Sequence, residues 1–159
     1  MKLFIRALAS FLLLPGIVAG LVPFLILGGH LHPSRAGIPG FVLLGAGLIL
    51  LLGCTRDFYV AGRGTLAPWD PPKNLVVVGL YRFIRNPMYV AVLMLLAGWA
   101  TAFGSLPLGG YFLCVAAAVH FRVVLAEEPW LSRTFGAEWQ RYASSVPRWI
   151  PRIGGVNGA

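Results

Sequence analysis

The sequence predicts an all-α integral membrane protein with about four transmembrane helices. Hydrophobic residues make up 58% of the 159 residues and charged residues only 11%, and the mean hydropathy is +0.78. A soluble domain usually carries about 25% charged residues, because its surface must be solvated. Here the polar residues are too few to enclose the apolar ones, so we expect lipid to cover part of the chain. The length predicts one membrane domain, residues 1–159.

Residues 1–55 predict two membrane-spanning helices. The uncharged runs Ala7–Gly29 and Ala36–Thr55 are each long enough to cross a hydrocarbon core of about 30 Å. The first run is longer than the apolar region of a signal peptide and has no clear cleavage site, so we expect it to be retained. Pro15 and Pro23 are expected to kink it, which membrane helices tolerate.

Residues 56–86 predict a cytoplasmic loop. Seven charged residues occur there together with several glycines and prolines, which are typical of extramembrane segments. A connection of this length often carries function.

Residues 87–126 predict a helical hairpin. The run Pro87–Phe121 has no charged residue, and as one straight helix it would be about 50 Å long, which exceeds the membrane core. The sequence GSLP at Gly104–Pro107 is expected to break it. The two cytoplasmic ends of the hairpin should then be neighbours, and they carry Arg85, Asn86 and Tyr89 on one side and Arg122, Glu127 and Glu128 on the other.

Residues 127–152 predict a cytoplasmic, amphipathic helical cap that lies at the membrane interface. Its apolar side chains recur at helical spacing, which indicates packing: Leu131, Phe135, Trp139 and Tyr142.

The distribution of basic residues predicts that both termini are cytoplasmic. With that orientation only Arg35, of 13 lysines and arginines, lies outside. The net charge of +8 suits anionic lipid headgroups, and basic residues scattered between apolar runs argue against a nucleic-acid partner. Cys54 and Cys114 stand alone, and His30 and His32 have no third ligand nearby, so no metal site is expected.

Two interpretations of Glu127 and Glu128 are open. In the structural one they pair with Arg85 and Arg122 and hold the hairpin together. In the functional one a carboxylate binds a cationic ligand or ribose hydroxyls, since unpaired carboxylates at a membrane boundary are costly. Two tyrosines near them could likewise be interfacial aromatics or pocket residues: Tyr81 and Tyr89.

Two blocks, GLYRFIRNPMY at 79–89 and AEEPWLSRTFGAEWQRYASSVPRWIPR at 126–152, resemble the isoprenylcysteine carboxyl methyltransferase and phospholipid methyltransferase superfamily. That family shows G-x-Y-x-x-x-R-H-P-x-Y, a hairpin, then E-E-x-x-L-x-x-x-F-G-x-x-Y-x-x-Y and V-P-R-x-x-P. The resemblance covers residues 72–152. It implies S-adenosylmethionine as cofactor and assigns the following residues to its binding: Lys73, Asn74, Leu75, Val76, Tyr81, Asn86, Pro87, Met88, Tyr89, Glu127 and Glu128.

Two departures from the family pattern concern its site. Asn86 replaces a histidine, which removes a proton-carrying group but keeps hydrogen-bonding ability. Val123 stands where the family places a substrate-facing arginine. Arg122 is the nearest arginine and the expected substrate-binding residue, although on an ideal helix it points about 100° away from position 123.

The implied function is methyl transfer to a lipophilic acceptor, similar to an isoprenylcysteine carboxylate, at the cytoplasmic membrane face. N-methylation of a phospholipid headgroup is the alternative, and it requires proton removal, for which Glu127 or Glu128 is the candidate. A membrane scaffold or transporter subunit is the non-enzyme alternative, although the spans carry no ionisable residue except His120. A homodimer through the first two spans is also left open.

Overall fold

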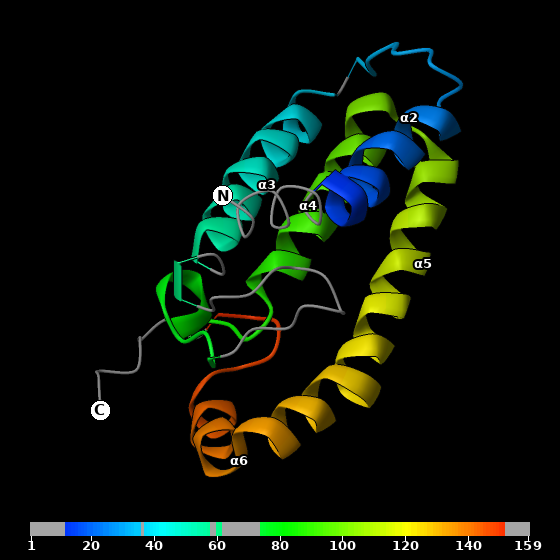
Figure 1. Ribbon diagram of the computed structural model, residues 1–159. Coiled ribbons are helices and arrows are strands. Elements are labelled where there is room, and N and C mark those ends of the chain that lie inside the picture. The colour runs from blue at the N-terminus through cyan, green and yellow to red at the C-terminus, as the bar shows by residue number, and fades with distance from the viewer. Residues whose placement is uncertain (1–11, 36, 58–59, 62–73, 152–159) are drawn as a thin grey trace.

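The computed structural model describes residues 12–35, 37–57, 60–61 and 74–151, and every element in this part of the chain is helical. The helices α3, α4 and α5 run side by side, η1 and α2 pack across them, and α6 lies at the far end of α5 (Figure 1). The elements are η1 (Leu12–Leu21), α2 (Val22–Ile26), α3 (Ile38–Asp57), η3 (Gly79–Arg82), α4 (Pro87–Phe103), α5 (Leu106–Arg122), η4 (Val123–Glu127) and α6 (Glu128–Ser145).

The helices α3 and α4 are packed backbone against backbone. A Cβ atom on Gly40 would lie 2.2 Å from the backbone nitrogen of Ala102, and one on Gly98 would lie 2.9 Å from the carbonyl oxygen of Gly40. Small residues permit this close approach, which is a common way of joining helices in membranes. The core around this contact contains Ala19, Leu51, Ala91, Val92, Leu95 and Leu96.

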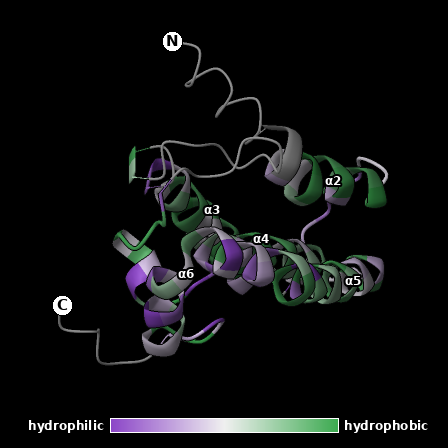
Figure 2. Cartoon of the chain, turned by 60° about the horizontal axis from the view of Figure 1, so that its bottom comes forward, coloured by the Kyte–Doolittle hydropathy of each residue, from purple (hydrophilic) through white to green (hydrophobic). Residues whose placement is uncertain are grey.

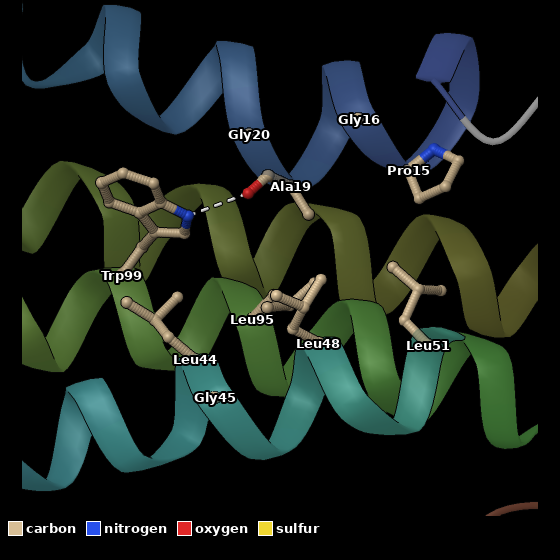
Figure 3. A pocket seen from close by; sticks show the side chains of 10 residues that line it. All are labelled: Pro15, Gly16, Ala19, Gly20, Leu44, Gly45, Leu48, Leu51, Leu95 and Trp99. Carbon is tan, nitrogen blue, oxygen red and sulfur yellow. Dashed lines mark hydrogen bonds between the residues drawn. The ribbon is translucent and has the colours of Figure 1, made fainter. Parts of the chain in front are cut away.

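The first helical segment depends on hydrogen bonds from its neighbours. Pro23 has no N–H, so the carbonyl groups four and five residues before it, on Ala19 and Val18, lose the donor that an α-turn or a π-turn would supply. Trp99 of α4 donates from Nε1 to Ala19 O over 2.8 Å (Figure 3), and the Tyr111 hydroxyl of α5 donates to Val18 O over 3.1 Å. In the described part of the first predicted span, residues 12–26 form a π-helix followed by a short α-helix, and two aromatic side chains tie it to the hairpin.

An apolar groove separates η1 from α3 and α4. It has a volume of about 370 Å³, and glycines widen it because no atom lies within 4 Å of a Cβ placed on Gly20 or Gly45. Figure 3 shows Leu44, Leu48 and Leu51 of α3 along its floor.

The helical hairpin is confirmed. The helix α4 is ended by Gly104, whose φ of +60° favours glycine, and the Ser105 side chain caps α5 by accepting from the Leu108 N–H over 3.4 Å. Pro107 lies in the first turn of α5, where its missing N–H costs nothing. The predicted break at Gly104–Pro107 is thus a turn of Gly104 and Ser105.

Two helical stretches are long and apolar enough to cross a membrane, namely Ile38–Asp57 and the continuous run Leu106–Ser145. Only 22% and 11% of their most apolar windows are buried, so most of these side chains face outward instead of forming a core. Figure 2 shows hydrophobic residues along α2 and α3 and hydrophilic ones concentrated on α6. Such large exposed apolar faces support association with a membrane.

The aromatic stripe of α6 packs as the sequence predicts. Trp139, Tyr142 and Val146 are buried together, with Leu131 and Phe135 against them. The helix is not straight, because Gly136 has a φ of +51° and bends it in the middle. This bend turns the second half of α6 back toward the segment before α4 (Figure 1).

Candidate functional site

Three polar side chains meet where the two arms of the hairpin end. The Tyr89 hydroxyl, from the first turn of α4, donates a hydrogen bond to Glu127 Oε1. Arg122, the last residue of α5, donates from Nε to the same oxygen over 2.8 Å and to the Tyr89 hydroxyl over 3.2 Å. Its side chain is 49% exposed, and no described residue bonds to its two Nη atoms. The expected proximity of the two hairpin ends is therefore confirmed.

Arg122 reaches Glu127 although it is not at position 123, because the helix is not ideal at this point. Residues Val123–Glu127 form a π-helical turn, in which backbone bonds join residues five apart. Arg122 is five residues before Glu127, so the π-turn brings the two side chains together. In a regular α-helix, the residue nearest to Glu127 one turn earlier would be at position 123. Val123 itself is fully buried. The π-turn thus places the Arg122 side chain beside Glu127, although valine occupies position 123, where the resemblance led us to expect an arginine.

Glu128 belongs to a second cluster. It accepts from Arg85 Nη1 over 2.9 Å and is held at both oxygens by Arg148, from Nε and Nη2, each over 2.7 Å. The Arg85 guanidinium also lies 5.7 Å from the centroid of the Trp139 ring. The hydrogen bonds that Arg148 donates to Glu128 raise the pKa of its guanidinium, so this arginine is charged at any physiological pH. Both carboxylates are therefore paired, as the structural interpretation requires.

The segment after α6 folds back onto the start of α4. Pro147 O accepts from the Arg85 N–H over 2.9 Å, and Arg148 O accepts from Asn86 Nδ2 over 3.3 Å. Asn86, which stands in place of the family histidine, therefore joins these two parts of the chain through its side-chain amide. Glu128 and Asn86 together fix residues 147–148 beside the site.

The predicted cofactor loop is described only in part, since Lys73 lies outside the described residues. Asn74 is exposed, Leu75 packs against the α6 cluster, and Val76 is buried with Cys54 and Tyr81. Within the described chain, no backbone hydrogen bond involves residues 74–77. In the described part of the chain, side-chain packing holds this segment in place, and backbone hydrogen bonds do not.

Tyr81 anchors the end of this loop. Its carbonyl accepts from the Tyr142 hydroxyl over 2.7 Å, which links η3 to α6. Burial raises the pKa of Tyr81 well above its usual range, so the hydroxyl stays protonated. Pro87 is buried in the first turn of α4, and Met88 packs between the two cores on either side of it.

One carboxylate in this region was not expected from the sequence. Asp57, the last residue of α3, lies against Gly79, such that a Cβ on Gly79 would be 2.0 Å from Asp57 Oδ2. Gly79 also has a φ of +56°, so glycine is required here for two reasons. The signal in the sequence was an acidic residue directly at the end of a predicted span, in a chain with only five acidic residues.

A family model described as phospholipid methyltransferase matches residues 38–138, from the start of α3 into α6. This is well over half of the chain. The chain belongs to the phospholipid methyltransferase family. The resemblance drawn from the two sequence blocks is confirmed, and membership in this family indicates a methyltransferase that acts on a lipid-like substrate. No curated protein and no solved structure gives a match.

The matched range of this phospholipid methyltransferase family member includes the η3 element, the whole hairpin and both glutamates. It stops before the segment 146–148 that folds back onto Arg85 and Asn86. The matched range contains Tyr89, Arg122 and Glu127, which meet at one end of the hairpin.

Proposed function

We propose that this protein uses S-adenosylmethionine to methylate a lipophilic acceptor, similar to an isoprenylcysteine carboxylate, at the cytoplasmic face of a membrane. The observation that carries the proposal is the contact among Tyr89, Arg122 and Glu127 at the end of two apolar helices, next to peptide groups of residues 74–77 that have no backbone partner in the described chain.

The polar groups of this region fit the cofactor chemically. S-adenosylmethionine carries ribose hydroxyls, an amino group and a carboxylate, and when bound it supplies a methyl group on a positively charged sulfur. Glu127 can accept from hydroxyls, and the peptide groups of residues 74–77 can both donate and accept. Asn74 at the exposed start of the segment adds a side-chain amide.

Arg122 is the group suited to hold the acceptor. Its Nε bonds to Glu127 and Tyr89, while its two Nη atoms, which have no partner among the described residues, can donate to an anionic group. Such a bidentate contact would fix the acceptor oxygen in line with the transferred methyl. A carboxylate acceptor loses its charge as it is methylated, so exclusion of water by the surrounding apolar helices favours the reaction.

The headgroup amine of a phospholipid is the alternative acceptor. It must lose a proton, and Glu127 is then the candidate base, because Glu128 is held by two arginines. A carboxylate acceptor requires no base, and this difference makes the pH dependence of the two reactions distinct.

The proposed topology has four spans, formed by the η1–α2 segment, α3, α4 and α5, with both termini in the cytoplasm. It is supported by the distribution of the basic residues. Arg35 lies between α2 and α3, on the outer side in this topology. The other described arginines lie on the cytoplasmic side: Arg56, Arg82, Arg85, Arg122, Arg133, Arg141 and Arg148. An uneven distribution of this kind is typical of multi-pass proteins.

Calorimetric titration of S-adenosylmethionine into the detergent-solubilised protein tests the proposal, with Glu127→Ala and Tyr89→Ala beside the wild type. We expect saturable binding that both substitutions weaken by at least about tenfold. Glu138→Ala, on the exposed side of α6, is the matched control and should bind as the wild type does. Folded wild-type protein that binds no cofactor would refute the enzyme and favour a scaffold.

A further inference from the structure

The carboxylate of Asp57 lies on the face of α3 that turns toward the proposed cofactor loop. Cys54, one helical turn earlier on the same face, is fully buried against Val76 and Tyr81. Asp57 itself is partly buried, and its Oδ2 rests on the backbone of Gly79. The carboxylate therefore sits between the end of a predicted span and the G-x-Y element of the loop.

Within the described residues, Asp57 differs from Glu127 and Glu128 in forming no ion pair with an arginine. Glu127 is paired with Arg122, and Glu128 with Arg85 and Arg148. In the part of the chain that the structure describes, no side chain or peptide group donates a hydrogen bond to Asp57. A carboxylate at the boundary between apolar helices and water is costly without a partner.

Asp57 is also electrostatically close to the rest of the site. Burial is the main cause of the raised pKa of Tyr81, and the charge of Asp57 and the Tyr89 hydroxyl both add to it.

We infer that Asp57 binds the ammonium group of a ligand, and this inference rests on the proposed function. A single carboxylate provides the charge and the acceptors for an ammonium group but too few ligands for a metal ion. The described residues also contain no group of three side chains able to hold a metal. The ammonium group has two sources: the amino group of the methionine part of S-adenosylmethionine, or the amine headgroup of a phospholipid acceptor.

The test compares S-adenosylhomocysteine with its analogue that lacks the amino group. Both are titrated calorimetrically into wild type, Asp57→Asn and the control Glu138→Gln, each checked for folding by thermal unfolding. If Asp57 binds the cofactor, Asp57→Asn weakens the amino ligand about tenfold and leaves the analogue unchanged. If it binds the acceptor, both affinities stay the same and the KM for phosphatidylethanolamine vesicles rises about tenfold, while the KM for an isoprenylcysteine acceptor does not change.

Unchanged affinities together with unchanged KM values in Asp57→Asn would overturn the inference and leave the proposed function standing. Wild-type protein that binds neither ligand would instead overturn the proposed function, and the inference with it. If Asp57→Asn does not fold, the inference is tested on the wild-type protein alone, by its affinities for the two ligands and its KM values for the acceptors. Equal affinities for the two ligands, with equal KM values for amine and non-amine acceptors, would then count against the role of Asp57.

Discussion

Arg122 donates a hydrogen bond from Nε to Glu127 Oε1 over 2.8 Å across a single π-helical turn. An α-helix would carry these two side chains to different faces, because five residues make about 1.4 α-helical turns. The wider π-turn reduces this offset. Helical irregularities of this kind are frequently found at functional sites.

The π-turn makes a substitution at Val123 informative. If the helix were regular, Val123→Arg would restore the family's arginine and increase activity. In the structure Val123 is fully buried, so we expect Val123→Arg to lower the free energy of unfolding by about 3 kcal/mol or more, since a buried charge has no partner there. Thermal unfolding in detergent measures this, with Ala126→Arg at an exposed position as control. A stable and more active Val123→Arg protein would contradict the π-turn.

Glu128 is expected to stabilise the fold more than it binds ligand. Glu128→Gln removes the charge that holds Arg85 and Arg148, and these side chains are only 14% and 32% exposed. The free energy of unfolding should fall by about 2 kcal/mol. Glu138→Gln, which is exposed, should change it by less than about 0.5 kcal/mol. An equally small effect of both substitutions in denaturant unfolding would show that the Glu128 pairs contribute little.

Gly79 is expected to tolerate no side chain while Asp57 is present. Gly79→Ala places a Cβ 2.0 Å from Asp57 Oδ2 and strains a backbone with a φ of +56°. We expect a loss of about 2–3 kcal/mol in unfolding free energy, of which about 1 kcal/mol is backbone strain. Adding Asp57→Ala should recover the steric part and leave the strain. A double variant as unstable as Gly79→Ala alone would mean that the two residues do not compete for space.

Trp99 is expected to replace a hydrogen bond that Pro23 cannot make. Trp99→Phe leaves Ala19 O without its donor and should cost about 1 kcal/mol. Pro23→Ala in the same chain supplies an N–H four residues after Ala19, so part of this loss should return. The double-variant cycle is measured by thermal unfolding, with the exposed Trp130→Phe as control. Strictly additive effects of the two substitutions would refute the exchange of donors.

Much of the fold follows from the sequence, because apolar runs and breakers are local signals. The predicted span Ala36–Thr55 corresponds to α3 at Ile38–Asp57, and the break at Gly104–Pro107 is the turn of the hairpin. The packing stripe of α6 is also correct, although its bend at Gly136 was not predicted. A positive φ at one glycine leaves no trace in the hydrophobic period.

The proximity of Tyr89 to Glu127 was predictable from the sequence, and the arrangement of the other side chains around them was less so. The length of the hairpin arms was enough to bring Tyr89 near Glu127. The direction of Arg122 was not predictable, since nothing in the residue types announces a π-turn. The contact of Asp57 with Gly79 joins residues on opposite sides of a loop, and no spacing rule covers such a distance.

The bonds from Arg85 and Asn86 to the backbone of Pro147 and Arg148 also set an order of assembly. All the apolar helices are synthesised, and can be inserted, before residues 146–148 leave the ribosome. Until then Arg85 and Asn86 have no backbone acceptor there, and Glu128 lacks Arg148. A chain truncated after Ser145 would contain every described helix and still lack these contacts, so residues 147–148 complete the cluster around Arg85, Asn86 and Glu128 only after the helices have been made.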